Sequence, residues 1–223
     1  TKLDTDGYGG TYTSVTIGAD GLGLITYFDD TNDDLKVAHC SDAACSSAAT
    51  ATLDSSGDVG TYTSVTIGAD GLGLISYYDN TNGDLKVAHC SDAACSSATR
   101  AYLNGEGLGG TYTSVTIGAD GLPLISYYNG TETWNPNNDL KVAHCSDAAC
   151  SSATTAILDS SGDVGMHTSV TIGADGLGLI SYYDKHNNDL KVAHCSDAAC
   201  SSAAITTLDS SGWVHGHTSV TIG

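Results

Sequence analysis

Residues 63–90 read TSVTIGADGLGLISYYDNTNGDLKVAHC. Thr63–Ile67 is a run rich in β-branched residues, and Ala69–Gly71 follows it. The Asp-Gly pair in this segment separates two apolar runs, and such a pair is a strong signal for a β-hairpin. Further strands are expected at Leu74–Tyr78 and Leu85–Cys90, because the Asn/Asp/Gly stretch between them favours a turn. No segment shows a helical period with capping residues. The stretch therefore predicts consecutive antiparallel strands.

The same pattern recurs along the whole chain of 223 residues. The string TSVTIG begins at Thr13, Thr63, Thr113, Thr168 and Thr218. A fourth strand is expected near the end of each unit, at about Ala98–Leu103 in the second. The predicted units are a partial repeat (fourth strand) at 1–12, repeats at 13–62, 63–112, 113–167 (with a loop insertion) and 168–217, and the start of a fifth at 218–223. Four antiparallel strands in a unit of this length are typical of a β-propeller blade.

The two ends of the chain align with each other. Residues 1–18 match residues 206–223 without a gap. The first and fourth strands of the unit therefore occur five times, whereas the second and third occur four times. We predict an all-β fold of tandem four-stranded antiparallel, blade-like repeats, and we favour a segment of an open array over a closed ring with spare strands.

The cysteines occur in four copies of CSDAAC. The predicted bridges are Cys40–Cys45, Cys90–Cys95, Cys145–Cys150 and Cys195–Cys200, since one pair per unit at constant spacing indicates a local disulfide. Lasting disulfides form in oxidising compartments, so an extracellular or cell-surface protein is expected.

The composition is strongly acidic, with 26 Asp plus Glu against 7 Lys plus Arg and a formal net charge of −19. Nucleic-acid binding is excluded, because phosphates require a basic surface, and anionic membranes are disfavoured. No apolar run approaches ~18 residues, so no membrane insertion is expected. This charge favours cations, above all calcium.

Carboxylates gather in two loop types that meet at one edge of each blade, and this edge predicts calcium binding. The candidate ligands are Asp29, Asp33, Asp34, Asp54, Asp58, Asp79, Asp84, Asp139, Asp159, Asp163, Asp184 and Asp189. The alternative is a set of solvated turns, where Asp and Asn are favoured for backbone reasons. No segment has the EF-hand pattern.

Other residues give weaker indications. Each first cysteine follows a histidine, as in His39-Cys40, but neighbours on a strand point to opposite faces, which favours a structural histidine over a zinc ligand. Trp134, in the third-unit insertion, is a candidate glycan contact or else a cover for a neighbouring blade. His167 replaces the usual tyrosine before the fourth TSVTIG string. No nucleophile elbow, phosphate loop or His-Glu-x-x-His motif is present, so we predict that the chain is not an enzyme.

The segments GLPLISYY (121–128) and DLKVAHC (139–145) resemble blades of secreted bacterial tandem-repeat proteins. The resemblance covers the whole chain and implies a β-propeller-like fold and an extracellular location. It implies no particular activity, because such blades have no single function. Calcium-bound extracellular filaments of tandem repeats are a second, weaker likeness.

These observations lead to one functional hypothesis and one alternative. The hypothesis is an extracellular structural or adhesive repeat protein, which forms a disulfide- and calcium-stabilised array or filament by contacting copies of itself or adjoining repeats head to tail. The alternative is a glycan-binding β-propeller lectin with shallow saccharide sites.

Overall fold

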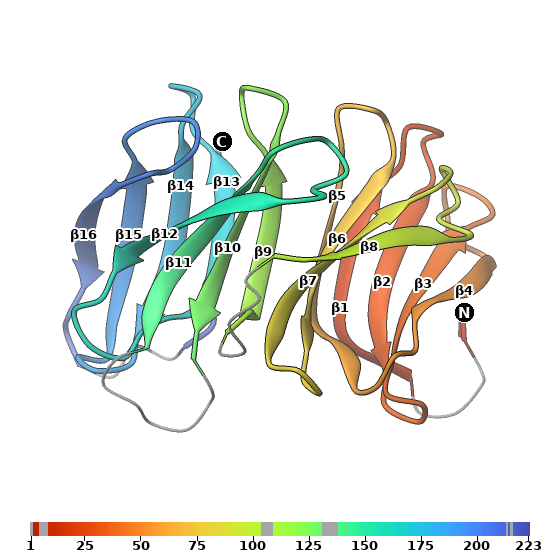
Figure 1. The fold of residues 1–223 in the computed structure, drawn as a ribbon, viewed down its shortest axis with the longest axis horizontal. Helices are drawn as coiled ribbons and strands as arrows, with labels where there is room; N and C mark the ends of the chain where they lie inside the picture. The colour runs from red at the N-terminus through yellow and green to blue at the C-terminus, as the bar shows by residue number, and fades with distance from the viewer. Residues whose placement is uncertain (1, 5–8, 104–108, 131–137, 213, 215) are drawn as a thin grey trace.

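The computed structural model describes residues 2–4, 9–103, 109–130, 138–212, 214 and 216–223. Over these ranges the protein is all-β and forms four separate four-stranded antiparallel sheets, here called the first to fourth blades (Figure 1). The first blade contains β1 (Gly9–Ile17), β2 (Gly23–Asp29), β3 (Asp34–Cys40) and β4 (Ala48–Asp54). The second contains β5 (Val59–Ile67), β6 (Gly73–Asp79), β7 (Asp84–Cys90) and β8 (Ala98–Tyr102). The third contains β9 (Thr111–Ile117), β10 (Pro123–Asn129), β11 (Asp139–Cys145) and β12 (Ala153–Asp159), and the fourth contains β13 (Val164–Ile172), β14 (Gly178–Asp184), β15 (Asp189–Cys195) and β16 (Ala203–Asp209).

The predicted fold class is confirmed, and the hairpins form for the local reasons that the sequence suggests. In the second blade, the turn between β5 and β6 is closed by a hydrogen bond from Gly68 N to Leu72 O of 2.8 Å. Asp70 Oδ1 accepts a hydrogen bond from Leu72 N, and Gly71 adopts a φ of 80° that strongly favours glycine. The Asp-Gly pair therefore fixes the turn in which it stands.

Neighbouring blades stack through their innermost strands β1, β5, β9 and β13, which lie side by side. One hydrogen bond repeats at every step, from a valine amide to a serine of the preceding blade: Val65 N to Ser14 Oγ at 3.1 Å and Val115 N to Ser64 Oγ at 3.2 Å. Val220 N makes the same bond to Ser169 Oγ at 3.2 Å. The C-terminal residues therefore lie at the innermost-strand position after the fourth blade, although no strand is assigned to 218–223, where we expected one.

The hydrophobic core lies between blades and not within them. Leu24, Leu35 and Val37 of the first blade pack with Ile75 and Tyr77 of the second, and all five are almost fully buried. Equivalent clusters join the second blade to the third and the third to the fourth. Both faces of the second strand must therefore be apolar in the second and third blades, because each face meets another blade.

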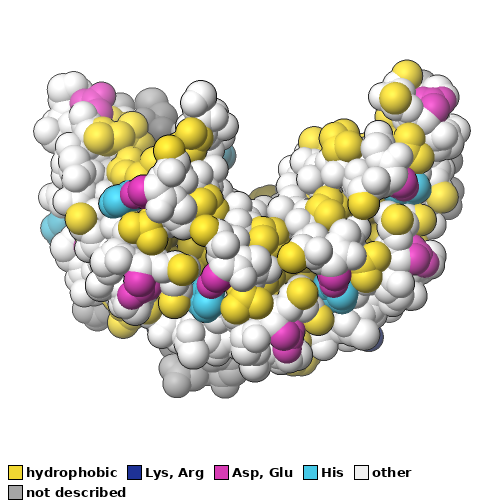
Figure 2. Space-filling view, turned by 90° about the horizontal axis from the view of Figure 1, so that it is seen from above, with side chains coloured by type: hydrophobic (Ala, Val, Ile, Leu, Met, Phe, Trp, Pro, Cys, Tyr) yellow, Lys and Arg dark blue, Asp and Glu magenta, His cyan; other side chains and the backbone are white. Residues whose placement is uncertain are grey.

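The blades form an arc that is open on one side, which the view from above shows as a hollowed, U-shaped surface (Figure 2). The sheets do not join into one continuous sheet. In the described part of the chain, no helix is long and apolar enough to cross a membrane.

Candidate functional site: an axial arc of aromatic rings

A β-bulge in each innermost strand directs an aromatic side chain toward the centre of the arc. The register between β5 and β6 shifts between Thr61 and Ser64, and the residue within the bulge, Tyr62, has a φ of 55°. Tyr12, Tyr112 and His167 occupy the same position with φ of 50°, 55° and 51°. A non-glycine residue in this region costs about 1–3 kcal/mol and is concentrated at functional sites. Bulges re-aim side chains in the same way.

These rings and His217 form one continuous row, here called the axial arc (Tyr12, Tyr62, Tyr112, His167 and His217). The centroid of the Tyr62 ring lies 4.6 Å from those of Tyr12 and Tyr112, and the two histidine steps are 4.2 Å each. All adjacent rings are tilted by 52–55°. All five line one cavity of about 370 Å³. The row therefore curves around a shared space.

Threonine hydroxyls accompany the rings. A second cavity of about 220 Å³ is lined by the axial arc together with Thr13, Thr63, Thr113, Thr168 and Thr218. Thr63 Oγ1 donates a hydrogen bond to Thr26 Oγ1 of the preceding blade at 3.0 Å, and Ser181 Oγ donates to Thr218 Oγ1 at 2.9 Å. The hydroxyls of Thr63, Thr113, Thr168 and Thr218 are each hydrogen-bonded to the blade before them, so the wall combines fixed hydroxyl groups with aromatic rings.

This combination suits a neutral, polyhydroxylated ligand. Tyrosine and histidine present ring surface to apolar C–H groups, while their polar atoms and the threonine hydroxyls can hydrogen-bond to the ligand. Among the described residues that line the two cavities, none is Asp or Glu. The site as described therefore has the means to bind a saccharide ring by stacking.

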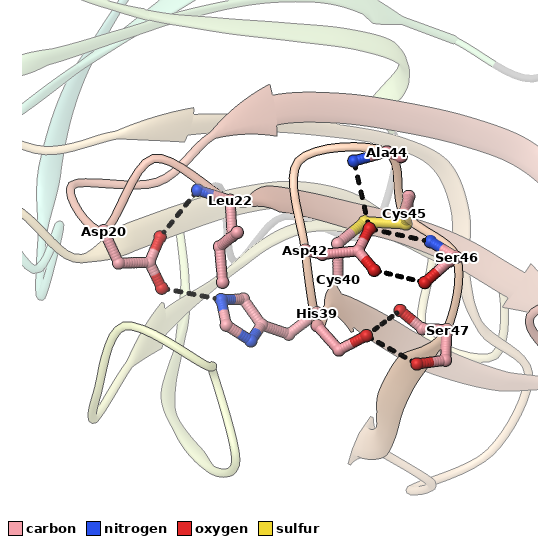
Figure 3. The surroundings of a disulfide bond; sticks show 10 residues. Asp20, Leu22, His39, Cys40, Asp42, Ala44, Cys45, Ser46 and Ser47 are labelled. Atoms are coloured by element: carbon pink, nitrogen blue, oxygen red, sulfur yellow. Dashed lines mark hydrogen bonds and ion pairs between the residues drawn. A yellow bond between two sulfur atoms is a disulfide. The ribbon is translucent and has the colours of Figure 1, made fainter.

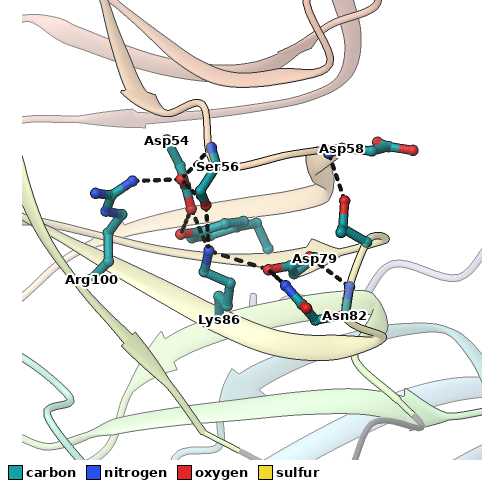
Figure 4. A network of polar contacts seen from close by, with 9 residues as sticks. Asp54, Ser56, Asp58, Asp79, Asn82, Lys86 and Arg100 are labelled. Atoms are coloured by element: carbon teal, nitrogen blue, oxygen red, sulfur yellow. Dashed lines mark hydrogen bonds and ion pairs between the residues drawn. The ribbon is translucent and has the colours of Figure 1, made fainter.

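Asp54 and Asp79, which the sequence suggested as calcium ligands, lie on either side of the ammonium group of Lys86 (Figure 4). Lys86 Nζ is 2.5 Å from Asp54 Oδ2 and 3.3 Å from Asp79 Oδ2, and all three side chains are almost fully buried. Asp54 comes from the blade before Lys86 and also accepts a hydrogen bond from Tyr77 Oη at 2.8 Å. Burial opposes the ionisation of Asp54, but the bonds from Lys86, Ser56 and Tyr77 outweigh it and hold its pKa far below the ordinary value.

The same arrangement repeats elsewhere. Asp159 and Asp184 flank Lys191 at 3.4 and 2.7 Å, and the pKa of Asp159 is also lowered, since hydrogen bonds from Ser161 and Tyr182 outweigh burial. In the first blade, Asp29 lies 3.6 Å from Lys36 Nζ.

The remaining candidates are dispersed over the blade edges. Asp163 accepts a hydrogen bond from Tyr128 Oη and lies 3.4 Å from Lys185 Nζ, and Asp58 accepts one from Asn80. Four lie at the start of a third strand: Asp34, Asp84, Asp139 and Asp189, and Asp33 precedes Asp34. Burial raises the pKa of Asp34 and of Asp139. Among the described residues, no three His, Cys, Asp or Glu side chains form a group that could hold a metal, and calcium binding stays a prediction.

At the opposite edge of each blade lie a disulfide and a histidine, which Figure 3 shows for the first blade as Cys40–Cys45 and His39. The structure contains the four disulfides expected from the spacing, with Cα–Cα distances of 4.7–4.8 Å. His39 Nε2 lies 2.8 Å from Asp20 Oδ2, and every blade repeats this pair, as the adjacent magenta and cyan patches in Figure 2 show. Disulfides of this kind fit a secreted protein. Trp134 lies outside the described residues.

The comparisons with known proteins show the fold. No protein family model matches the sequence, and no curated protein matches it. The structure is similar to a thermostable family-43 glycoside hydrolase (15% identity, 94% of this chain and 76% of that chain, TM-score 0.57). It is also similar to α-L-arabinofuranosidase from Lactobacillus brevis (10%, 88% and 72%, TM-score 0.57) and to a putative exo-β-1,3-galactanase from Bifidobacterium bifidum (11%, 84% and 67%, TM-score 0.54). At these identities the likeness establishes the β-propeller-like fold.

Two predictions from the sequence are contradicted by this comparison. The interpretation as a structural or adhesive filament and the expectation of a non-enzyme are both contradicted, because several solved structures with a similar fold are named as an arabinofuranosidase, a galactanase, a glycoside hydrolase and a xylanase. The missing motifs had suggested a chain without chemistry. Glycoside hydrolases are recognised by the placement of side chains around a cavity, which no short motif in one repeat records.

The axial arc was not predicted from the sequence, in which His167 is only a departure from the repeat. The available signal was the tyrosine directly before TSVTIG, at 12, 62 and 112.

Proposed function

We propose that the protein is a carbohydrate-active protein and that it binds a saccharide in the cavity of the axial arc. The observation that carries this proposal is the row of five rings lining one space with five threonines. Support comes from the strained backbone at Tyr12, Tyr62, Tyr112 and His167, because the fold bears its cost at the same position in each blade.

The fold indicates which saccharides to test first. The similar structures are named for an arabinofuranosidase, a galactanase and a xylanase, so arabinan, β-1,3-galactan and xylan are the first ligands. Retaining and inverting glycosidases use a pair of carboxylates beside the bond that breaks, whereas no Asp or Glu is among the described residues that line the two cavities. Saccharide binding and saccharide cleavage are therefore measured separately, by calorimetry with oligosaccharides and by the release of reducing ends from the polymers.

The variant Tyr62→Ala tests the site, because Tyr62 lies in the middle of the arc with a ring on each side. We expect it to weaken saccharide binding by about 5- to 30-fold, since stacking on one ring contributes about 1–2 kcal/mol. Tyr62→Phe keeps the ring and should bind within about threefold of the wild type. Tyr102→Ala is the matched control, because that ring is 53% exposed on β8, away from the axis.

The proposal fails if none of the three polysaccharides binds and a broad glycan array is also negative. It fails equally if Tyr62→Ala and Tyr102→Ala bind the same saccharide as well as the wild type does.

A further inference from the structure

The first blade presents a copy of a surface that is buried in the other blades, and this copy is uncovered at Val15 and Gly10, whereas Tyr27 and Ala38 are only 4% and 2% exposed. Val65, Val115 and Val170 are each 7% exposed because the preceding blade covers them, whereas the equivalent Val15 is 65% exposed. A Cβ atom added to Gly60 would meet Leu35 Cα of the preceding blade at 2.7 Å, and Gly110 and Gly165 stand equally close to their neighbours. At the equivalent Gly10, no atom of the described residues lies within 4 Å of the added Cβ.

A cavity of about 300 Å³ marks this surface. Ile25, Tyr27 and Ala38 line it, together with residues 2–4 and nearby glycines. Their counterparts in the second blade are Ile75, Tyr77 and Ala88, which pack against Leu24, Leu35 and Val37 of the first. The cavity therefore has the lining that accepts two leucines and a valine at each internal interface.

The fourth blade has the complementary surface. Leu208 is 60% exposed, whereas the equivalent Leu53 and Leu103 are 6% and 8% exposed. Leu179, Leu190 and Val192 are only partly buried, although their counterparts in the other three blades are fully buried. Asp209 is exposed and accepts hydrogen bonds from Ser211, but among the described residues it has no Tyr and Lys pair of the kind that binds Asp54.

The chain already makes two of the contacts that a further blade would make. Asp4 accepts hydrogen bonds of 2.6 Å from Tyr27 Oη and Lys36 Nζ, as Asp54 does from Tyr77 and Lys86 one blade later. At the other end, Thr218 and Val220 bind the fourth blade as an innermost strand does. The described residues therefore make contacts of an outermost and an innermost strand, and none of them makes the contacts of the two middle strands.

We propose that the opening between the fourth and first blades binds a two-stranded β-hairpin with the pattern of the repeat's own second and third strands. On one face, its two leucines and valine fill the cavity at Ile25, Tyr27 and Ala38. On the other face, its isoleucine and tyrosine cover Leu208, and its tyrosine hydroxyl and lysine ammonium reach the carboxylate of Asp209. The hairpin closes the arc into a ring, so that the axial arc becomes enclosed on all sides.

The test uses a peptide with the sequence of residues 69–98, its Cys90–Cys95 bridge formed, labelled with a fluorophore and titrated with the protein. An isolated hairpin is marginally stable in water, so the peptide should fold as it binds. We expect saturable one-to-one binding and slower amide hydrogen exchange in β2 and at Val220. Val15→Asp and Leu208→Asp each weaken binding by about tenfold or more, as loss of one buried aliphatic contact implies.

Both variants leave the folded protein intact, because the wild-type side chains are largely exposed. Ile157→Asp is the matched control, since Ile157 is 53% exposed on β12, away from both surfaces. The proposal is wrong if the peptide does not bind, or if Val15→Asp and Leu208→Asp bind it as well as Ile157→Asp does. It is also wrong if the protein alone sediments as a dimer that Val15→Asp dissociates, because a second copy then covers the surface. None of these readouts depends on saccharide binding.

Discussion

The contact between Asp54 and Lys86 joins two blades, and the substitution Asp54→Asn tests how much it stabilises them. The side chain of Asp54 is fully buried, and that of Lys86 is 2% exposed. Removing one partner of a buried ion pair costs about 3–5 kcal/mol, because the other charge stays buried. Asp79 lies 3.3 Å from Lys86 Nζ and keeps part of the compensation. Arg100 Nη1, at 2.5 Å from Asp54, is 44% exposed and contributes little. We therefore expect a loss of about 3 kcal/mol in the free energy of unfolding.

The repeat supplies a matched control for this variant. Asp209 occupies the same position in the fourth blade but is exposed, and its hydrogen-bond donors come from Ser211. Asp209→Asn should change the free energy of unfolding by less than about 0.5 kcal/mol. Urea unfolding followed by circular dichroism measures both variants, with the slope of the transition checked for loss of cooperativity between repeats. Equal midpoints for Asp54→Asn and Asp209→Asn would refute the reasoning.

Three further predictions follow from the same contacts. Folding lowers the pKa values of Asp54 and Asp159. Their contribution to the free energy of unfolding is therefore complete above the unfolded pKa of about 3.9 and is lost as the pH falls below it. Urea midpoints at pH 7 and pH 3 should differ more for the wild type than for the double variant Asp54→Asn with Asp159→Asn. Replacing Cys90 and Cys95 by serine should lower the free energy of unfolding by about 2 kcal/mol, and a thermal midpoint that stays unchanged would contradict this. Gly60→Ala should destabilise the protein more than Gly10→Ala. Both glycines have a φ above 100°, but only at Gly60 would the new Cβ lie 2.7 Å from a backbone atom of Leu35. Equal thermal midpoints for the two variants would count against close packing of the blades.

The strands could be predicted because their signals are local. In the second blade the predicted strand at Leu74–Tyr78 lies within β6, and Leu85–Cys90 lies within β7. Alternation, β-branched residues and Asp-Gly turns act over a few residues, so one repeat contains the necessary information. No strand is assigned to residues 2–4 of the partial repeat expected at 1–12, nor to residues 218–223. The segment 218–223 has no second strand of its own blade to pair with among the described residues. This shows that pairing, and not propensity alone, forms a strand.

The partners of the acidic residues could not be predicted in the same way. Asp54 and Lys86 are 32 residues apart and belong to different blades, so their contact depends on how the blades stack. From the sequence, the carboxylates were expected at one edge of each blade, either as ligands of an external cation or in solvated turns, and a lysine of the next blade was not considered as their partner. The lysine in every DLKVAHC segment was counted as part of a strand. The pairing of a buried carboxylate such as that of Asp54 with a lysine of the next blade could therefore be seen only in the three-dimensional structure.

The axial arc could not be predicted from one repeat either, because its rings come from successive blades. The ring contacts and the backbone strain at Tyr62 nearly cancel, so the arc contributes little to the free energy of unfolding. The ring of Tyr62 has two neighbours at 4.6 Å, and each such pair contributes about 0.5–1.5 kcal/mol. Its left-handed backbone costs about 1–3 kcal/mol, so the two contributions nearly cancel. Tyr62→Gly removes the ring and the strain together, and we expect it to leave the free energy of unfolding within about 1 kcal/mol of the wild type while it weakens saccharide binding as Tyr62→Ala does. Calorimetric binding and urea unfolding of the same sample measure both quantities. If Tyr62→Gly unfolded the protein, the arc would be a structural element, and the strain in its backbone would have no functional meaning.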